Sequence, residues 1–201
     1  YMYPLFESVC IANGEIQNDT YHESRFKSSF YALFGFEAKY SLFDNLHLPR
    51  IDTSLKCKLR IEYNEIGVKW TVSEYVNKIP TSLLLLKDDE IDYRLKYTDR
   101  KQLNHSYQQK GDFEDVLIIK NGFITDATYS NILFTDGHKI ITPSNSLLQG
   151  TCRTRLLTEE IITEAPIKAD SIHLFESFQL INALNDFDEN RWISIQNIAN
   201  G

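Results

Sequence analysis

Three dipeptides that favour tight turns constrain the fold of this 201-residue chain more than any other feature. Asn13-Gly14, Asn121-Gly122 and Asp136-Gly137 each stand between runs of strand-forming residues. Such pairs readily adopt the positive φ angles of hairpin turns, so each predicts two antiparallel strands. A further hairpin is predicted about residues 64–67. Because hairpins dominate and are mixed with helical segments, we predict an α+β fold rather than a doubly wound parallel sheet.

The spacing of apolar residues predicts a helix that ends at Gly35, a natural C-terminal stop. Thr20 and Glu23 form a capping-box pattern at its start. The apolar side chains on one face of this helix are Phe26, Phe30, Leu33 and Phe34. A second helix is predicted directly after Gly150.

A change in composition near residues 87–90 predicts a domain boundary. The segment "TSLLLLK" (81–87) has the pattern of a buried strand, and an acidic, polar stretch follows it. We therefore expect a smaller N-terminal domain over residues 1–87 and a larger C-terminal domain over residues 91–201.

Charge and composition exclude several classes of protein. The net charge is −7 and the basic residues are scattered, which argues against nucleic-acid binding. No apolar run approaches the length of a membrane span, and no basic stretch precedes an apolar one at the N-terminus. The cysteines form no C-x-x-C pair, and their odd number suits a reducing compartment: Cys10, Cys57 and Cys152. We expect a cytoplasmic protein without a nucleic-acid or membrane partner.

Familiar metal and nucleophile motifs do not occur in the sequence. The five histidines are far apart and lack the H-x-H and H-E-x-x-H spacings, so no metal site is predicted. The patterns G-x-S-x-G, G-x-G-x-x-G and G-x-x-x-x-G-K are also missing.

Four segments together carry a more specific signal: "YHESRF" (21–26), "YRLKYTDRKQLN" (93–104), "GFITDATYSNILF" (122–134) and "TPSNSLLQGTCRTRLL" (142–157). Their order and spacing resemble the class IV pyridoxal-phosphate enzymes, which include branched-chain and D-amino-acid aminotransferases and aminodeoxychorismate lyase. The resemblance spans nearly the whole chain. It implies the two-domain class IV aminotransferase-like fold, a pyridoxal 5'-phosphate cofactor, a small-molecule amine substrate and a homodimer.

Asp126 occupies the first position of the family's "E-x-x-x-x-N" pattern, and Asn131 occupies its last. The resemblance implies that the Asp126 carboxylate keeps the pyridine nitrogen of the cofactor protonated. Aspartate is one methylene shorter than the usual glutamate. The alternative is a solvated edge strand in which Asp126, Thr128 and Ser130 face water.

Lys96 matches the lysine that binds the cofactor covalently in this family. Such an amine must also move the substrate's proton. Lys87 and Lys101 are the neighbouring alternatives, although an isolated lysine would more often be solvated.

The resemblance implies that Arg25, in the "H-x-x-R" segment, binds the phosphate of the cofactor with its guanidinium. Gly150, Thr151 and Cys152 would complete this phosphate site, because the start of a helix presents backbone N–H groups to an anion. Cys152 stands where the family usually has a threonine. The alternatives are a surface arginine on an amphipathic helix and a plain turn at Gly150.

Two reactions are compatible with this set of residues. The closing "LINAL" (180–184) resembles aminodeoxychorismate lyase more than the aminotransferases, and Ser8 lies where family members carry a threonine near the cofactor. We therefore favour 4-amino-4-deoxychorismate lyase, which forms p-aminobenzoate and pyruvate in folate biosynthesis. The alternative is an aminotransferase acting on D- or branched-chain amino acids. A non-catalytic relative is disfavoured, because a decayed site should lose its lysine first.

Overall fold

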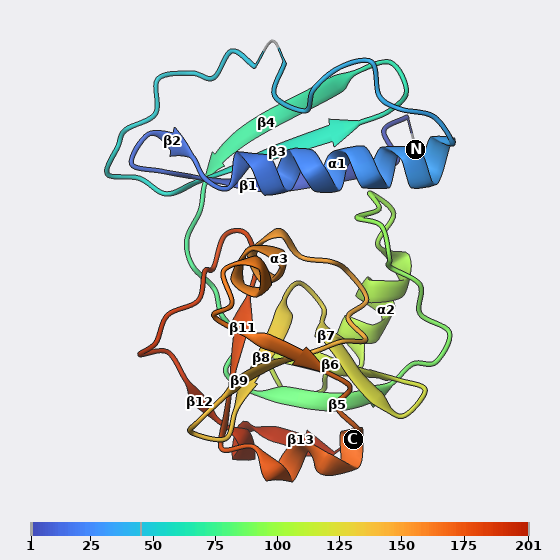
Figure 1. Ribbon diagram of the computed structural model, residues 1–201, viewed down its shortest axis with the longest axis vertical. Coiled ribbons are helices and arrows are strands. Elements are labelled where there is room, and N and C mark those ends of the chain that lie inside the picture. Colours follow the sequence, from blue (N-terminus) through green and yellow to red (C-terminus); the bar gives the residue numbers. More distant parts are fainter. Residues whose placement is uncertain (1, 45, 201) are drawn as a thin grey trace. The chain divides into compact units, whose positions relative to one another are not determined.

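A computed structural model of the protein describes residues 2–44 and 46–200. The chain divides into two compact units (Figure 1). Unit 1 comprises Tyr1–Asn77 and Leu95–Asp99, and unit 2 comprises Lys78–Arg94 and Arg100–Gly201. Both units combine hairpins with helical structure, so the predicted α+β class is confirmed.

Unit 1 consists of a sheet with the strand order β2-β1-β3-β4 and one long helix. Its elements are β1 (Leu5–Ala12), β2 (Glu15–Ile16), α1 (Asp19–Phe34), β3 (Cys57–Tyr63) and β4 (Val68–Glu74). All pairs in this sheet are antiparallel. The helix packs on one face of the sheet and forms the core of the unit with apolar residues of β1 and β3.

Helix α1 follows the sequence prediction at its end more closely than at its start. Gly35 has a φ of 80° and its N–H donates to the carbonyl of Tyr31, as expected of a C-terminal stop. The predicted capping box does not form, because Asn18 is the N-cap and Thr20 lies inside the helix. The predicted apolar face is buried at Phe26 and Phe30, whereas Leu33 is 37% exposed.

The three predicted Gly-containing hairpins are present. Asn13 and Gly14 have φ angles of 55° and 78°, and they join β1 to β2. Asn121 and Gly122 have φ angles of 53° and 81°. Gly137 has a φ of 84° and lies in the connection between β8 (Asn131–Thr135) and β9 (Ile140–Pro143). Positive φ at both central residues is the signature of a type I′ turn, so the local sequence explains the first two connections.

Unit 2 contains two sheets, with the orders β10-β9-β8-β11-β12 and β13-β5-β6-β7. Its strands are β5 (Leu83–Lys87), β6 (Asp115–Lys120), β7 (Phe123–Ala127), β8 (Asn131–Thr135), β9 (Ile140–Pro143), β10 (Thr163–Ala165), β11 (Ser177–Ile181), β12 (Ile193–Ser194) and β13 (Ile198–Asn200). Its helices are α2 (Lys101–Gln108), α3 (Thr151–Thr158) and the 3-10 helices η1 (Ala169–Leu174) and η2 (Ile195–Asn197). Over the described residues, no helix is long and apolar enough to cross a membrane.

The main core of unit 2 contains side chains of both sheets. Leu83 and Leu117 come from one sheet, and Phe134 and Phe178 come from the other. A smaller core places Leu156 of α3 against residues of β8 and β11. The helix that contains the predicted phosphate-binding residues is therefore anchored by apolar packing.

The division into units differs from the expected boundary at residues 87–90. β5 pairs in parallel with β6, so the "TSLLLLK" segment belongs to the sheet of unit 2. Residues 95–99 return to unit 1, where Leu5 forms a bridge with Tyr97. Long-range strand pairing decides both placements, and composition along the chain carries no signal for it.

Candidate active site

Lys96 belongs to unit 1 and not to the C-terminal domain in which it was expected. The N–H of Phe6 donates to the Lys96 carbonyl at 3.0 Å, and the N–H of Thr98 donates to the Pro4 carbonyl at 2.8 Å. Residues 96–98 thus provide hydrogen-bond partners for backbone groups at the beginning of β1. The Nζ atom of Lys96 lies 5.0 Å from the centroid of the Phe6 ring.

Arg25 lies in the same unit and pairs with a buried carboxylate. Glu7, on β1, is fully buried, and its Oε1 atom accepts a hydrogen bond from Arg25 Nε at 2.8 Å. Its Oε2 atom accepts hydrogen bonds from Arg25 Nη2 and, at 2.7 Å, from His22 Nδ1. An ionised carboxylate only accepts, so His22 carries a proton on Nδ1. The three residues form a cluster between β1, which carries Glu7, and α1, which carries His22 and Arg25.

The electrostatics of this cluster keep the carboxylate charged. Burial alone raises the pKa of Glu7, but the charge of Arg25 and the hydrogen bonds from His22 and Arg25 outweigh it and lower the pKa to about 2. Burial lowers the pKa of His22, while its hydrogen bond to Glu7 acts in the opposite direction. The positive charges of Arg25 and Lys96 lower the His22 pKa further. At neutral pH the cluster therefore contains an ionised glutamate, a charged arginine and a neutral histidine.

Asp126 lies in unit 2 at an irregularity of β7. The pairing of β6 with β7 shifts between Leu117 and Ile119, where two residues of β7, Thr125 and Asp126, stand opposite one residue of β6, Ile118. A bulge of this kind redirects side chains. Asp126 and Thr128 are 5% and 3% exposed, so the alternative of a solvated edge strand does not hold for them.

The Asp126 carboxylate accepts two hydrogen bonds from unit 2. Asn131 Nδ2 donates to Oδ1 at 2.8 Å, and the N–H of Leu148 donates to Oδ2 at 3.0 Å. Burial raises the Asp126 pKa to about 6, although these hydrogen bonds and the charge of Arg153 oppose the increase. A cationic group beside this carboxylate would lower its pKa and hold it ionised.

Gly150 lies beside Asn131 at the start of α3. A Cβ atom at Gly150 would stand 1.9 Å from Asn131 Oδ1, so this contact leaves no space for a side chain. Asn131 Nδ2 also donates to the Leu148 carbonyl at 3.0 Å, which links the amide to the chain entering the helix. Gly150 is the N-cap and provides no side-chain cap. The first amides of a helix have no partner within it.

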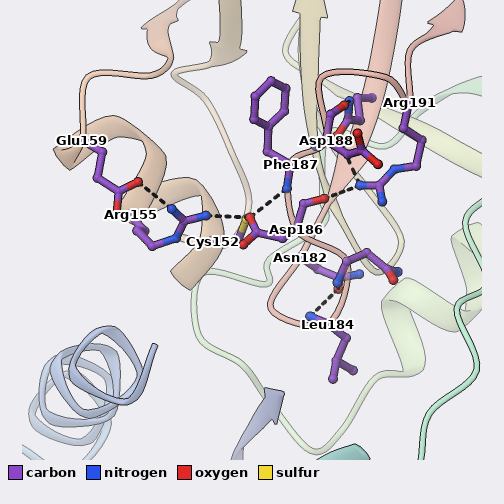
Figure 2. A network of polar contacts seen from close by, with 11 residues as sticks. Cys152, Arg155, Glu159, Asn182, Leu184, Asp186, Phe187, Asp188 and Arg191 are labelled. Carbon is purple, nitrogen blue, oxygen red and sulfur yellow. Dashed lines mark hydrogen bonds and ion pairs between the residues drawn. The ribbon is translucent and has the colours of Figure 1, made fainter. Parts of the chain in front are cut away.

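The side chain of Cys152 is directed to a loop after β11 (Figure 2). Its Sγ atom donates to Asp186 Oδ1 at 3.1 Å, and Arg155 Nη2 donates to the same oxygen at 2.6 Å. The N–H of Phe187 is a third donor to it, at 2.7 Å, and Arg191 binds the Asp186 carbonyl. Burial and the Asp186 charge raise the pKa of the thiol. Cys152 thus connects α3 to this loop through its side chain.

The structure distributes the predicted residues over two groups. Unit 1 holds Lys96 and Arg25, and unit 2 holds Asp126 with Asn131, Gly150, Thr151 and Cys152. Sequence reasoning missed Glu7, His22 and Asp186. An acid inside the apolar run "LFESV" and a His and an Arg one helical turn apart are signals that could have found the first two.

Known proteins with similar sequences and structures identify the family of the chain. The model of the class IV amino-transferase family matches residues 93–187. An uncharacterized protein of Haemophilus influenzae is 38% identical over 186 residues, which cover 92% of this chain and 99% of that protein. A solved structure of a proposed 4-amino-4-deoxychorismate lyase from Haemophilus somnus is 28% identical, with a TM-score of 0.82 over 93% of this chain and 99% of its own. A hypothetical aminotransferase from Mycobacterium tuberculosis in its PLP-bound form is 12% identical, with a TM-score of 0.69 over 97% of this chain and 81% of its own.

The chain belongs to the class IV aminotransferase family. It is therefore an enzyme of a family that depends on pyridoxal phosphate and acts on small amino compounds. The residues present fit this cofactor chemically. Unit 2 offers a buried carboxylate for a protonated pyridine nitrogen and, at Gly150, a helix start without a side chain. Unit 1 offers a lysine amine and an arginine whose orientation Glu7 fixes.

Proposed function

We propose that the enzyme is a 4-amino-4-deoxychorismate lyase, which converts its substrate into p-aminobenzoate and pyruvate for folate biosynthesis. The observation that carries the proposal is the position of the "LINAL" segment. Asn182 in this segment donates to Ser130 Oγ at 3.0 Å and to the Tyr129 carbonyl at 3.3 Å. The segment that most resembles the lyase therefore contacts the turn between Asp126 and Asn131. The similarity to the proposed lyase from Haemophilus somnus supports the same choice.

Each candidate residue has a defined role in this proposal. When bound, pyridoxal phosphate supplies a ring that withdraws electrons from the substrate carbon. Lys96 would hold the cofactor covalently until the substrate amine displaces it. The freed Lys96 amine would then accept the proton from the amine-bearing carbon and return it to the departing enolpyruvyl group. Asp126 keeps a proton on the ring nitrogen, and its neighbour Asn131 fixes the orientation of the carboxylate.

Arg25 and the first turn of α3 bind the phosphate in this proposal. Glu7 accepts hydrogen bonds from two nitrogens of Arg25, so the guanidinium is already oriented before any ligand binds. The backbone N–H groups after Gly150 supply further donors. The Cys152 side chain binds Asp186 and is not needed as a donor to the phosphate. This supports a role for the backbone of that residue.

The link to Lys96 can be tested by reduction with borohydride and peptide mapping. Wild-type protein purified with the cofactor should retain it covalently on the peptide that contains Lys96. Lys96→Ala should lose the adduct, and Lys101→Ala, the matched control, should keep it. A reducible adduct that survives in Lys96→Ala would refute the assignment.

The reaction can be tested by following pyruvate with lactate dehydrogenase and NADH. A lyase should release pyruvate and p-aminobenzoate from aminodeoxychorismate through many turnovers without any 2-oxo acid. The alternative, an aminotransferase, should stop after one turnover until an acceptor such as 2-oxoglutarate is added. Sustained conversion of a D- or branched-chain amino acid only in the presence of the acceptor, with no pyruvate from aminodeoxychorismate, would replace the lyase proposal.

The proposal includes a cytoplasmic homodimer. Large apolar side chains are exposed near the end of α1, with Tyr31 at 58% and Phe36 at 43%. Such surfaces commonly mark interfaces between subunits. Sedimentation should show a dimer at micromolar concentration, and a monomer would contradict this part of the proposal.

A further inference from the structure

The face of the unit 1 sheet opposite to α1 carries a row of polar side chains. Ser8 on β1 pairs in register with Arg60 on β3, which pairs in register with Thr71 on β4. Paired residues of adjacent strands point to the same face of a sheet. α1 packs against the opposite face, where Val9 and Leu59 are buried. The three side chains of the row therefore lie side by side away from α1.

The guanidinium of Arg60 is fixed on two sides. Its Cζ atom lies 3.7 Å from the centroid of the Phe6 ring, which is the distance of a stacked guanidinium. Its Nε atom donates to Glu62 Oε1 at 2.8 Å. Although the side chain is 30% exposed, these contacts restrict its position. Less conformational entropy is therefore lost when a ligand binds to it.

In the described part of the chain, the remaining donors of this row have no protein partner. Within residues 2–44 and 46–200, the Nη groups of Arg60 and the hydroxyls of Ser8 and Thr71 make no hydrogen bond. Glu62 is shared between Arg60 and Lys69, which lies 2.6 Å from Glu62 Oε2, so one acid faces two cations. A planar fork of N–H donors with excess positive charge matches a carboxylate.

Phe6 contacts both Arg60 of this row and Lys96, the lysine proposed to bind the cofactor. The ring that stacks on Arg60 also lies 5.0 Å from Lys96 Nζ, and the N–H of Phe6 donates to the Lys96 carbonyl. Both cationic groups therefore lie around one buried aromatic ring in the same unit. A ligand attached at Lys96 would have a carboxylate-binding group nearby.

We infer that Arg60, assisted by the hydroxyls of Ser8 and Thr71, binds a carboxylate of the substrate. The inference rests on the proposed function, because it takes the substrate to react at Lys96. Both the lyase and the aminotransferase act on carboxylates. The role of Arg60 can therefore hold even if the choice of reaction fails.

Calorimetric titration of the enzyme with bound cofactor tests this inference. The carboxylate probes are 4-aminobenzoate, a product of the proposed lyase, and 2-oxoglutarate, an acceptor for the alternative reaction. The neutral probe is 4-aminobenzamide. Loss of a charge-assisted contact in Arg60→Gln should weaken binding of at least one carboxylate about ten- to a hundredfold. Binding of the neutral probe should change less than about threefold.

Two further variants separate specific recognition from general charge or structural effects. Lys69 pairs with Glu62, and these two residues lie two positions along β4 and β3 from the row that contains Arg60. Lys69→Gln removes this cation but leaves the row intact, so it should retain most of the carboxylate affinity. Arg60→Lys keeps the charge without the fork and should give an intermediate affinity. The affinity for pyridoxal phosphate should not change in Arg60→Gln, because the proposed ligand is the substrate carboxylate and not the phosphate.

Each outcome of these titrations either supports or refutes the role of Arg60 in binding the substrate carboxylate. A selective loss for 2-oxoglutarate alone would support Arg60 while favouring the aminotransferase reaction. Equal effects of Arg60→Gln on neutral and charged probes would refute the inference, and so would equal effects of Lys69→Gln and Arg60→Gln. Failure of wild-type enzyme to bind either carboxylate at millimolar concentration would also refute it. Weakened cofactor binding in Arg60→Gln would assign the residue to the phosphate instead.

Discussion

Replacement of Glu7 by glutamine should destabilise unit 1 far more than its single-atom change suggests. Glutamine offers one acceptor oxygen in place of two and carries no charge, so Arg25 loses its bidentate, charged partner. The decrease of the Glu7 pKa from 4.5 to about 2 corresponds to about 3 kcal/mol. Removing one member of a buried ion pair typically costs about 3–5 kcal/mol. We expect a loss of about 3 kcal/mol at pH 7.

The effect should depend on pH with a defined sign. Since the folded state lowers the Glu7 pKa, the unfolded chain binds the proton more readily, and stability falls as pH falls. The contribution of Glu7 is complete above about pH 5 and is lost progressively between its ordinary pKa of 4.5 and about 2. The difference between wild type and Glu7→Gln should therefore shrink over that range.

The assay can be restricted to unit 1, because the two tryptophans lie in different units. Trp70 is in β4, and Trp192 is in unit 2. In a Trp192→Phe background, the fluorescence of the half-buried Trp70 reports unfolding of unit 1 by urea. Glu74→Gln, an exposed glutamate of the same sheet, is the control and should change the free energy of unfolding by less than about 0.5 kcal/mol. Equal stabilities of Glu7→Gln and Glu74→Gln at pH 7, or a difference that stays constant down to pH 2, would refute the reasoning.

Three predictions concern unit 2. Because burial raises the Asp126 pKa to about 6, the cofactor-free protein should lose stability as pH rises from about 4 to 6, and Asp126→Asn should remove up to about 3 kcal/mol of this loss in urea titrations. Gly150→Ala should destabilise the protein by about 1–3 kcal/mol and weaken cofactor binding, since its Cβ would meet Asn131 at 1.9 Å. Gly67→Ala, with no atom within 4 Å of its Cβ, is the control. Asp186→Asn removes the charge of an ion pair to α3 in which Asp186 is 55% exposed and Arg155 17% exposed, and the asparagine oxygen can still accept hydrogen bonds, so thermal unfolding should show a loss of only about 1 kcal/mol.

Local chemistry explains the features that sequence reasoning predicted correctly. Gly14 and Gly122 adopt positive φ angles in hairpin turns, and Gly35 does so at the end of α1, because a residue without a Cβ enters this region easily. Alternation of apolar and polar residues in β3 appears as strict alternation of burial. These signals depend on neighbouring residues alone.

Long-range contacts decided the features that the sequence did not reveal. The parallel pairing of β5 with β6 and β13 places "TSLLLLK" in unit 2. The backbone hydrogen bond from Phe6 of β1 to the Lys96 carbonyl places Lys96 in unit 1. The same holds for Asp126, whose bulge buries a carboxylate that period-two alternation could equally place in water. Which strand edge a segment meets depends on the whole fold.

The sequence by itself determined the hairpins, the α+β class and, through four motifs in order, the family. It also fixed the kinds of groups available for chemistry: one lysine, one arginine, one acid and a glycine before a helix. Only the tertiary structure decided their environments, because burial and charge depend on residues distant in sequence. It buried Glu7 between His22 and Arg25, raised the pKa of Asp126 by desolvation and stacked Arg60 on the ring beside Lys96. Those environments set the protonation and orientation of each group, which residue types alone leave open.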